Sequence, residues 1–285
     1  MSPSWNERLI VQIGPNAVHA ARMRIWPSGV ALAEASIAIE GDKDAQPLDS
    51  RSAAASESSM GIALRDAINA VSGRGRSITI HLSDVFVTYF VLPWSQSLKG
   101  ESDWARLAAI HAVRLLDMEA TRLQVRVRTA RRGAPRLACA VPRTVVEAIR
   151  AARPDQGHRI AEVAPHVISA FNAARPILDR HATEHRWILA CEDDRVTIGI
   201  TNAGRWVDIF KAWAAADPQA LFAMIEQEAL YRGIATPVRA LVTPLPWIAA
   251  EESFTLPNGF QFQAIGALPS VGTTNEQSLP TARAA

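Results

Sequence analysis

The sequence predicts an α/β protein made of two similar halves, each with a mixed sheet that contains an antiparallel meander and is flanked by helices. Residues 8–39 read as three short strands separated by Pro, Gly, Asn and Ser turns, and residues 187–213 repeat this pattern. Helices and further strands follow both meanders. With 285 residues, 48% of them hydrophobic, the chain has enough apolar material for two cores.

The repeat sets the expected domain bounds. We expect a first half at residues 1–180, a smaller second half at 181–269, and a polar tail at 270–285 that is predicted to be disordered. The strands expected in the two meanders are 8–14, 17–26, 30–39, 187–191, 196–201 and 206–213.

After its meander, the first half is expected to continue through a polar connection, Gly41–Ser59, and a helix, Met60–Val71, to a turn at residues 73–76. Residues 77–94 then read as two buried strands, because they are rich in β-branched and aromatic residues. An amphipathic helix follows from Ser102, its expected N-cap, to Met118. The residues expected on its buried stripe are Trp104, Leu107, Ala108, His111, Leu115 and Met118.

A predicted hairpin comes next, with strands at 123–128 and 137–141, and it carries a local cluster of arginines. We interpret the cluster as a solvated strand face and not a phosphate-binding patch, since no aromatic residue that could stack on bases lies between the arginines. Its members are Arg126, Arg128, Arg131, Arg132 and Arg136.

The remaining helices are predicted from their caps. Thr144 and Glu147 have the spacing of a capping box for a helix at 145–152, and after a strand at 160–163 a helix at 167–174 is expected to end at Pro176. In the second half, Asp217 and Pro218 begin a helix. Its expected buried residues are Leu221, Met224, Ile225 and Tyr231, and strands are expected at 238–242 and 260–265.

Charge and composition exclude several classes of function. The 30 basic and 28 acidic residues give a net charge of +2, so no global field would recruit nucleic acid. Cys139 and Cys191 lack C-x-x-C spacing and are interpreted as buried thiols in a reducing compartment. We find no signal peptide and no apolar run of the roughly eighteen residues that a membrane span needs. A cytoplasmic protein is therefore expected.

The stretch Leu82–Trp94 reads L-S-D-x-F-V-x-Y-x-x-L-P-W, and a helix and the strand at 123–128 follow it. This order resembles the actin-like proteins of type IV pilus and type II secretion assembly, the PilM family and the cytoplasmic part of the GspL family. The resemblance implies an actin-like ATPase fold of two ribonuclease-H-like halves. It also implies a scaffold, peripheral to the inner membrane, that docks the cytoplasmic tail of an inner-membrane subunit. An assembly ATPase and a second copy in a homodimer are further expected partners.

In active members of that fold, three motifs hold nucleotide, and here each departs from the pattern. In the first, D-I-G-x-x-x-V-K, Gly14 remains, but Gln12 replaces the aspartate and His19 the lysine. In the second, D-x-G-x-x-x-T, Thr197 remains, but Asp193 stands where glycine lets phosphate approach. The Gly-Gly of the third is replaced by Thr243-Pro244. We therefore expect a pseudo-ATPase without a cofactor, the alternative being an active ATPase with ATP and Mg.

A zinc peptidase is a third hypothesis. His181, Glu184 and His185 match H-x-x-E-H, in which two histidines one helical turn apart bind zinc and the glutamate acts as base. A strand is expected to begin at Trp187, so we favour a linker here and predict no metal site.

Overall fold

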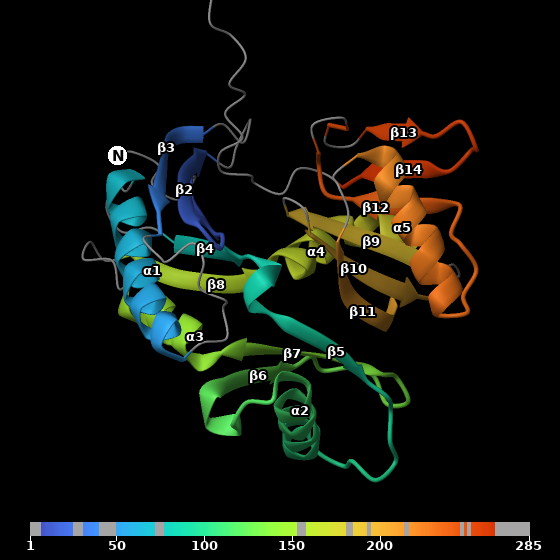
Figure 1. The fold of residues 1–285 in the computed structure, drawn as a ribbon, viewed down its shortest axis with the longest axis horizontal. Helices are drawn as coiled ribbons and strands as arrows, with labels where there is room; N and C mark the ends of the chain where they lie inside the picture. Colours follow the sequence, from blue (N-terminus) through green and yellow to red (C-terminus); the bar gives the residue numbers. More distant parts are fainter. Residues whose placement is uncertain are drawn as a thin grey trace, which may run out of the picture.

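The computed structural model describes residues 7–24, 31–39, 50–71, 77–152, 158–180, 185–192, 195–213, 217–245, 248–249 and 252–265. The chain forms two lobes, each with its own sheet, and a small third unit below the first lobe (Figure 1). No helix in these ranges is long and apolar enough to cross a membrane. The predicted turn at 73–76 and the predicted tail at 270–285 lie outside the described residues.

The first lobe is a five-stranded sheet in the order β3-β2-β1-β4-β8. Its strands are β1 (Glu7–Ile13), β2 (Ala17–Arg24), β3 (Ala31–Ala38), β4 (Ser77–Leu82) and β8 (Arg159–Pro165). The first three form the predicted antiparallel meander, and β4 and β8 run parallel to β1. Alternate residues of β1, among them Leu9 and Val11, pack with α1 (Ser50–Val71) and α3 (Arg143–Ala151), so the other face of the sheet looks away from these helices.

The second lobe is a six-stranded sheet in the order β11-β10-β9-β12-β14-β13. Its strands are β9 (His185–Glu192), β10 (Arg195–Asn202), β11 (Arg205–Trp213), β12 (Arg239–Val242), β13 (Ser253–Thr255) and β14 (Gln261–Ala264). The second predicted meander is confirmed as β9-β10-β11, and β12 and β14 are parallel to β9. Helix α5 (Pro218–Tyr231) covers this sheet, and α4 (His166–Arg180) lies between the lobes (Figure 1).

The third unit is an insertion between β4 and β8, and we call it the inserted unit. It is a three-stranded sheet of β5 (Thr88–Leu92), β7 (Arg136–Pro142) and β6 (Leu123–Val127), in that order, with α2 (Glu101–Leu116) on one face. Short 3-10 turns at Asp84–Phe86 and Ala120–Arg122 connect its elements. The hairpin of β6 and β7 was predicted, but its assembly with β5 into a separate sheet was not.

Three predicted helix starts are wrong. Helix α1 begins at Ser50, ten residues earlier than expected, because the segment before Met60 contains no Gly or Pro and is rich in alanine. The N-cap of α2 is Gly100, and the Asp103 carboxylate accepts its backbone N–H. The capping box at Thr144 is absent, since α3 starts one residue before it with no side-chain cap.

Three further helix predictions fail because tertiary packing overrides local rules. Helix α4 continues through Pro176 to Arg180, and burial of Leu178, which is 4% exposed, offsets the hydrogen bond lost at the proline. Tyr231, expected in the core, is 83% exposed at the end of α5. His111, placed on the buried stripe of α2, is exposed, although its ring lies 4.8 Å from that of Phe90.

Both cysteines are free thiols, and both are half-buried where the sequence predicted buried residues. Burial raises the pKa of Cys139 to about 11 and that of Cys191 to about 12, so neither is a reactive thiolate at neutral pH.

Candidate functional site between the two lobes

The parallel strands of both sheets end at the boundary between the lobes, and a polar residue stands at each of four strand ends. Ser83 and Asp84 follow β4, His166 follows β8, Glu192 ends β9, and Thr243 follows β12. In α/β proteins, ligands bind in the crevice outside the carboxyl ends of parallel strands. This boundary is therefore the candidate functional site.

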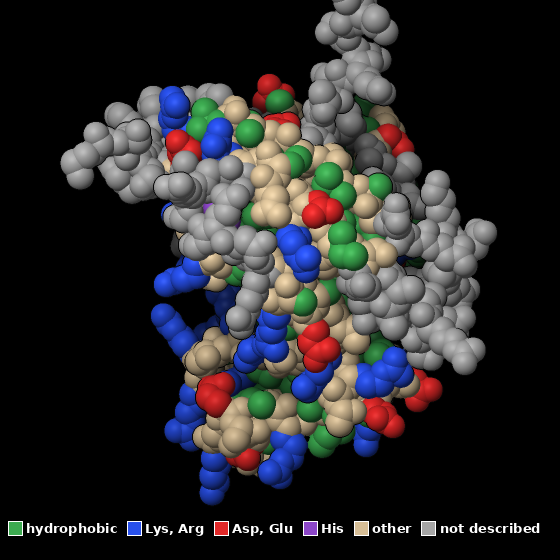
Figure 2. Space-filling model, turned by 90° about the vertical axis from the view of Figure 1, so that its left-hand side faces the viewer, with side chains coloured by type: hydrophobic (Ala, Val, Ile, Leu, Met, Phe, Trp, Pro, Cys, Tyr) green, Lys and Arg blue, Asp and Glu red, His purple; other side chains and the backbone are tan. Residues whose placement is uncertain are grey.

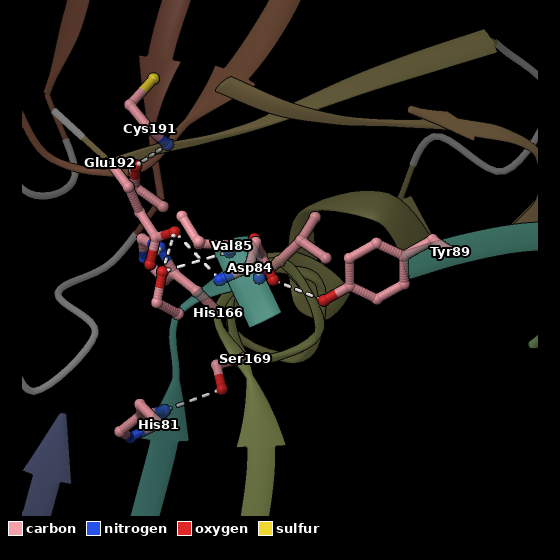
Figure 3. Close-up of polar contacts among 11 residues, drawn as sticks. His81, Asp84, Val85, Tyr89, His166, Ser169, Cys191 and Glu192 are labelled. Atoms are coloured by element: carbon pink, nitrogen blue, oxygen red, sulfur yellow. Dashed lines mark hydrogen bonds and ion pairs between the residues drawn. The ribbon is translucent and has the colours of Figure 1, made fainter. Parts of the chain in front are cut away.

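Glu192 from the second lobe contacts three groups around the first lobe, two through hydrogen bonds and one as an ion pair. Its Oε2 accepts the Ser83 hydroxyl at 2.8 Å and the backbone N–H of Asp84 at 3.0 Å, and its Oε1 lies 3.1 Å from Nδ1 of His166. Figure 3 shows this carboxylate reaching down from β9 to the turn after β4. Glu192 thus acts as an internal anion that occupies donors of the first lobe.

Asp84 is the most deeply buried member of the cluster, with 1% of its surface exposed. One carboxylate oxygen accepts the Tyr89 hydroxyl of β5, and the other accepts the backbone N–H of Val167 at 3.0 Å in the first turn of α4. Burial raises the pKa of Asp84 to about 6, against the lowering effects of His166 and these hydrogen bonds. The group therefore changes charge near neutral pH.

His166 and Glu192 form an ion pair. Burial alone would lower the pKa of His166, but the Glu192 and Asp84 carboxylates outweigh burial and raise it. For Glu192, burial would raise the pKa, but His166, Ser83 and the Asp84 N–H lower it. The positive imidazolium and the negative carboxylate thus stabilise one another.

The same residues have the chemistry of a divalent-cation site. Asp84, His166 and Glu192 each offer a ligand atom, and these atoms lie within 4.8 Å of one another. Carboxylate and imidazole donors suit zinc, manganese or iron. Each of these side chains already contacts a protein group, so the arrangement stands without an ion, and the absence of a metal site stays a prediction.

The first predicted nucleotide motif forms a row across the first sheet. Gln12 lies opposite His19 on β2 and opposite His81 on β4, on the face that looks away from α1. The Nδ1 of His81 is 2.8 Å from the Ser169 hydroxyl of α4. Burial is the main cause that lowers the pKa of His81, and the charge of His166 lowers it further.

Gly14 of the same motif forms the β1–β2 turn, where a Cβ would lie 3.2 Å from the Ala17 carbonyl oxygen.

The second motif is only partly visible. Thr197 is 3% exposed and lies inside β10, opposite Lys211, so it faces no open cleft. Asp193 lies outside the described residues. At the third motif, the Thr243 hydroxyl accepts the Cys191 N–H at 3.1 Å and ties the ends of β12 and β9 together.

Sequence reasoning did not identify the central residues Ser83, Asp84, His166 and Glu192 as a site. The available signal was positional, because each lies at or directly after the end of a strand, as in Leu82-Ser83-Asp84. No local motif joins them, and Ser83 and Glu192 are separated by 109 positions.

The structure also bears on the zinc-peptidase hypothesis. His185 is the first residue of β9 and pairs with Asn202 of β10, so it is not on a helix. Residues 181–184 lie outside the described residues.

Comparison with solved structures identifies the fold as actin-like. A PilM–PilN type IV pilus biogenesis complex matches 83% of this chain and 81% of its own with a TM-score of 0.58 and 10% identity. A Bacteroides thetaiotaomicron protein with an actin-like ATPase fold and unknown function covers 86% of each chain, with a TM-score of 0.52 and 10% identity. The cytoplasmic domain of EpsL, an inner membrane component of the Vibrio cholerae type II secretion system, covers 84% and 83%, with a TM-score of 0.51 and 12% identity.

No protein-family model matches the chain, and no curated protein matches it in sequence. At identities near 10%, the solved structures show the fold alone.

Proposed function

We propose that this actin-like protein is a cytoplasmic scaffold of a type IV pilus or type II secretion-related machine, with a degenerate nucleotide site. In this proposal it docks the cytoplasmic tail of an inner-membrane subunit and lies peripheral to that membrane. Structural likeness to the PilM–PilN complex and to the EpsL cytoplasmic domain supports the choice of machine.

The observation that carries the degenerate site is the placement of Glu192. Its carboxylate takes up the Ser83 hydroxyl, the Asp84 N–H and His166, which are the kind of donors that would otherwise bind a phosphate between the lobes. A second carboxylate, Asp84, lies beside it. A nucleotide phosphate would have to displace one negative charge and approach another, which is unfavourable in a buried site.

An active Mg-ATP-binding protein is the alternative, and one observation favours it. The Asp84 and Glu192 carboxylates stand at the ends of parallel strands, where they could hold Mg through oxygen ligands. Gln12, which replaces the aspartate of the first motif, weakens this alternative because an amide supplies no negative charge to a metal ion. His19 likewise stands where the motif has a lysine.

The deciding experiment is a calorimetric titration of the purified chain with Mg-ATP, followed by Mg-ADP. We expect no binding heat at nucleotide concentrations of about 1 mM. A dissociation constant above this concentration corresponds to a binding free energy weaker than roughly 4 kcal/mol. A micromolar dissociation constant would overturn the degenerate site and establish the alternative. A Ser83→Ala variant, which removes one donor but keeps Glu192, should behave like the parent.

Docking is tested separately with synthetic peptides of the cytoplasmic tails of single-span pilus and secretion subunits from the same genome. We expect one tail to bind with a micromolar dissociation constant, about 8 kcal/mol. If none of the tails binds, the scaffold assignment fails even when nucleotide is not bound.

A further inference from the structure

Strand β6 is an open edge of the inserted unit. In the described part of the chain it pairs only with β7. The Arg128 N–H donates to the Leu137 carbonyl of β7. In an antiparallel ladder every second residue bonds to the same neighbouring strand, so the backbone groups of Arg126 and Gln124 are also directed at β7. The N–H and C=O groups of Val125 and Val127 therefore point outward, where another strand could pair with them.

This edge carries a strong local excess of positive charge. Between Ala120 and Val146 the chain has seven arginines and no Asp or Glu, although its net charge overall is only +2. Arg136 is paired with Glu101 at 2.7 Å. The exposed others are Arg122, Arg126, Arg128, Arg131, Arg132 and Arg143. Figure 2 shows Lys and Arg side chains gathered on the lower part of the molecule, at the height where Figure 1 places the inserted unit.

Two of these arginines lie on one face of the strand at alternate positions. Val125 and Val127 pack with the apolar residues beneath α2, so Arg126 and Arg128 point from the opposite face. Arg128 stacks over the Phe171 ring of α4, with 5.3 Å from its guanidinium carbon to the ring centre. That face therefore looks toward α4 and the body of the protein.

We propose that the β6 edge binds an extended acidic segment of a partner protein, which adds as a fourth strand next to β6. Backbone hydrogen bonds to Val125 and Val127 would hold the segment, and carboxylates at every second residue would lie beside Arg126 and Arg128. An anionic membrane could meet the charges, but it would leave the outward backbone groups of β6 without a strand to pair with. An acidic partner segment would both neutralise the arginines and pair with the outward backbone groups.

This inference deepens the docking part of the proposed function and rests on it only in requiring a protein partner. The contrary reading is that the arginines serve only to prevent edge-to-edge aggregation, as charged residues do on many edge strands. The two readings differ in one outcome, because a purely protective edge binds no peptide.

The test is fluorescence anisotropy with a labelled seven-residue peptide of alternating valine and glutamate, at about 0.1 M salt. A peptide of the same composition with its glutamates grouped at one end is the control for sequence order, and phosphatidylglycerol vesicles are the control for a membrane. We expect the alternating peptide to bind at least about tenfold more tightly than the grouped one, because only it matches the period of the strand. Equal binding of both peptides, or binding to the vesicles alone, would overturn the proposal.

Two variants locate the site. Val125→Pro removes an outward N–H but no bond to β7, and it should weaken peptide binding about tenfold while the melting curve changes little. Arg126→Gln should weaken binding about threefold, whereas Arg106→Gln on the outer side of α2 should not. Unchanged affinity in the folded Val125→Pro variant would place binding elsewhere. Since the probe is a synthetic peptide, its failure would leave the nucleotide and tail titrations untouched.

Discussion

The two edge strands of the inserted sheet have opposite surroundings. Strand β5 lies against β11, and its Tyr89 donates to the buried Asp84 carboxylate of the cluster between the lobes. On the far side, β6 presents outward backbone groups and arginines to solvent. Polar groups at the β5 edge are satisfied inside the chain, so they hold the lobes together. Of the seven arginines around β6, Arg136 is the one with a carboxylate partner among the described residues, so the remaining positive charge is available to an outside partner.

The largest effect is expected at the closed edge. Glu192→Ala leaves the Ser83 hydroxyl, the Asp84 N–H and His166 without their common partner, so we expect a loss of about 4 kcal/mol in the free energy of unfolding. Chemical denaturation measures it. Glu226→Ala, on the exposed side of α5, is the control and should change stability by less than about 0.5 kcal/mol. Similar values for both variants would mean that the cluster does not join the lobes.

A pair of proline substitutions at β6 tests which backbone groups face outward. Arg126→Pro removes an N–H directed at β7 and should cost about 3 kcal/mol, whereas Val125→Pro removes an outward N–H and should cost less than about 1 kcal/mol. Thermal unfolding of both variants gives the comparison. If Val125→Pro were the more damaging variant, the edge would be oriented the other way.

The closed cluster should also make stability depend on pH. The pKa of Asp84 is about 6, above its unfolded value, so stability falls as the pH rises from about 5 to 7, by roughly 1 kcal/mol. The raised pKa of His166 acts in the same direction, because its stabilising charge is lost at higher pH. The lowered pKa of Glu192 acts in the opposite direction at acidic pH, because the ion pair weakens only as the pH falls below the usual range of a glutamate.

Denaturation at a series of pH values measures this slope, and Asp84→Asn should flatten it. Gln227→Ala, on the exposed side of α5, removes no titratable group and is the control that should leave the slope unchanged. An unchanged slope in Asp84→Asn would show that the carboxyl does not titrate in this range.

The smallest effect on stability is expected at the open edge. Replacing Arg131 and Arg132 with glutamine removes two exposed charges at the hairpin tip and should change the free energy of unfolding by less than about 0.5 kcal/mol. Loss of like-charge repulsion would make any change a slight gain at low salt. A loss above about 1 kcal/mol in chemical denaturation would mean that these arginines have partners within the fold. The β6 edge would then not differ from the β5 edge in this respect.

Local patterns predicted much of the fold but little of the site. Both meanders were found because alternating apolar residues and turn residues are local signals, and the start of α5 was found from Asp217, which accepts the Ala220 N–H at 2.9 Å. The buried side of α2 was predicted only in part, because Trp104 and Ala108 were placed on it correctly but Ala112 was missed. Trp104, Ala108 and Ala112 face the inserted sheet, whereas Leu115, at 54% exposure, lies outside the core.

The sequence by itself determined the strands other than β13, the order of the elements and hence the actin-like resemblance, because these depend on residues close together in the chain. Only the tertiary structure decided that Ser83, Asp84, His166 and Glu192 meet, since three strand ends from two sheets must first be brought to one boundary. It also decided that β6 is an edge. The arginines were visible in the sequence, but whether a strand has one neighbour or two is a property of the assembled sheet.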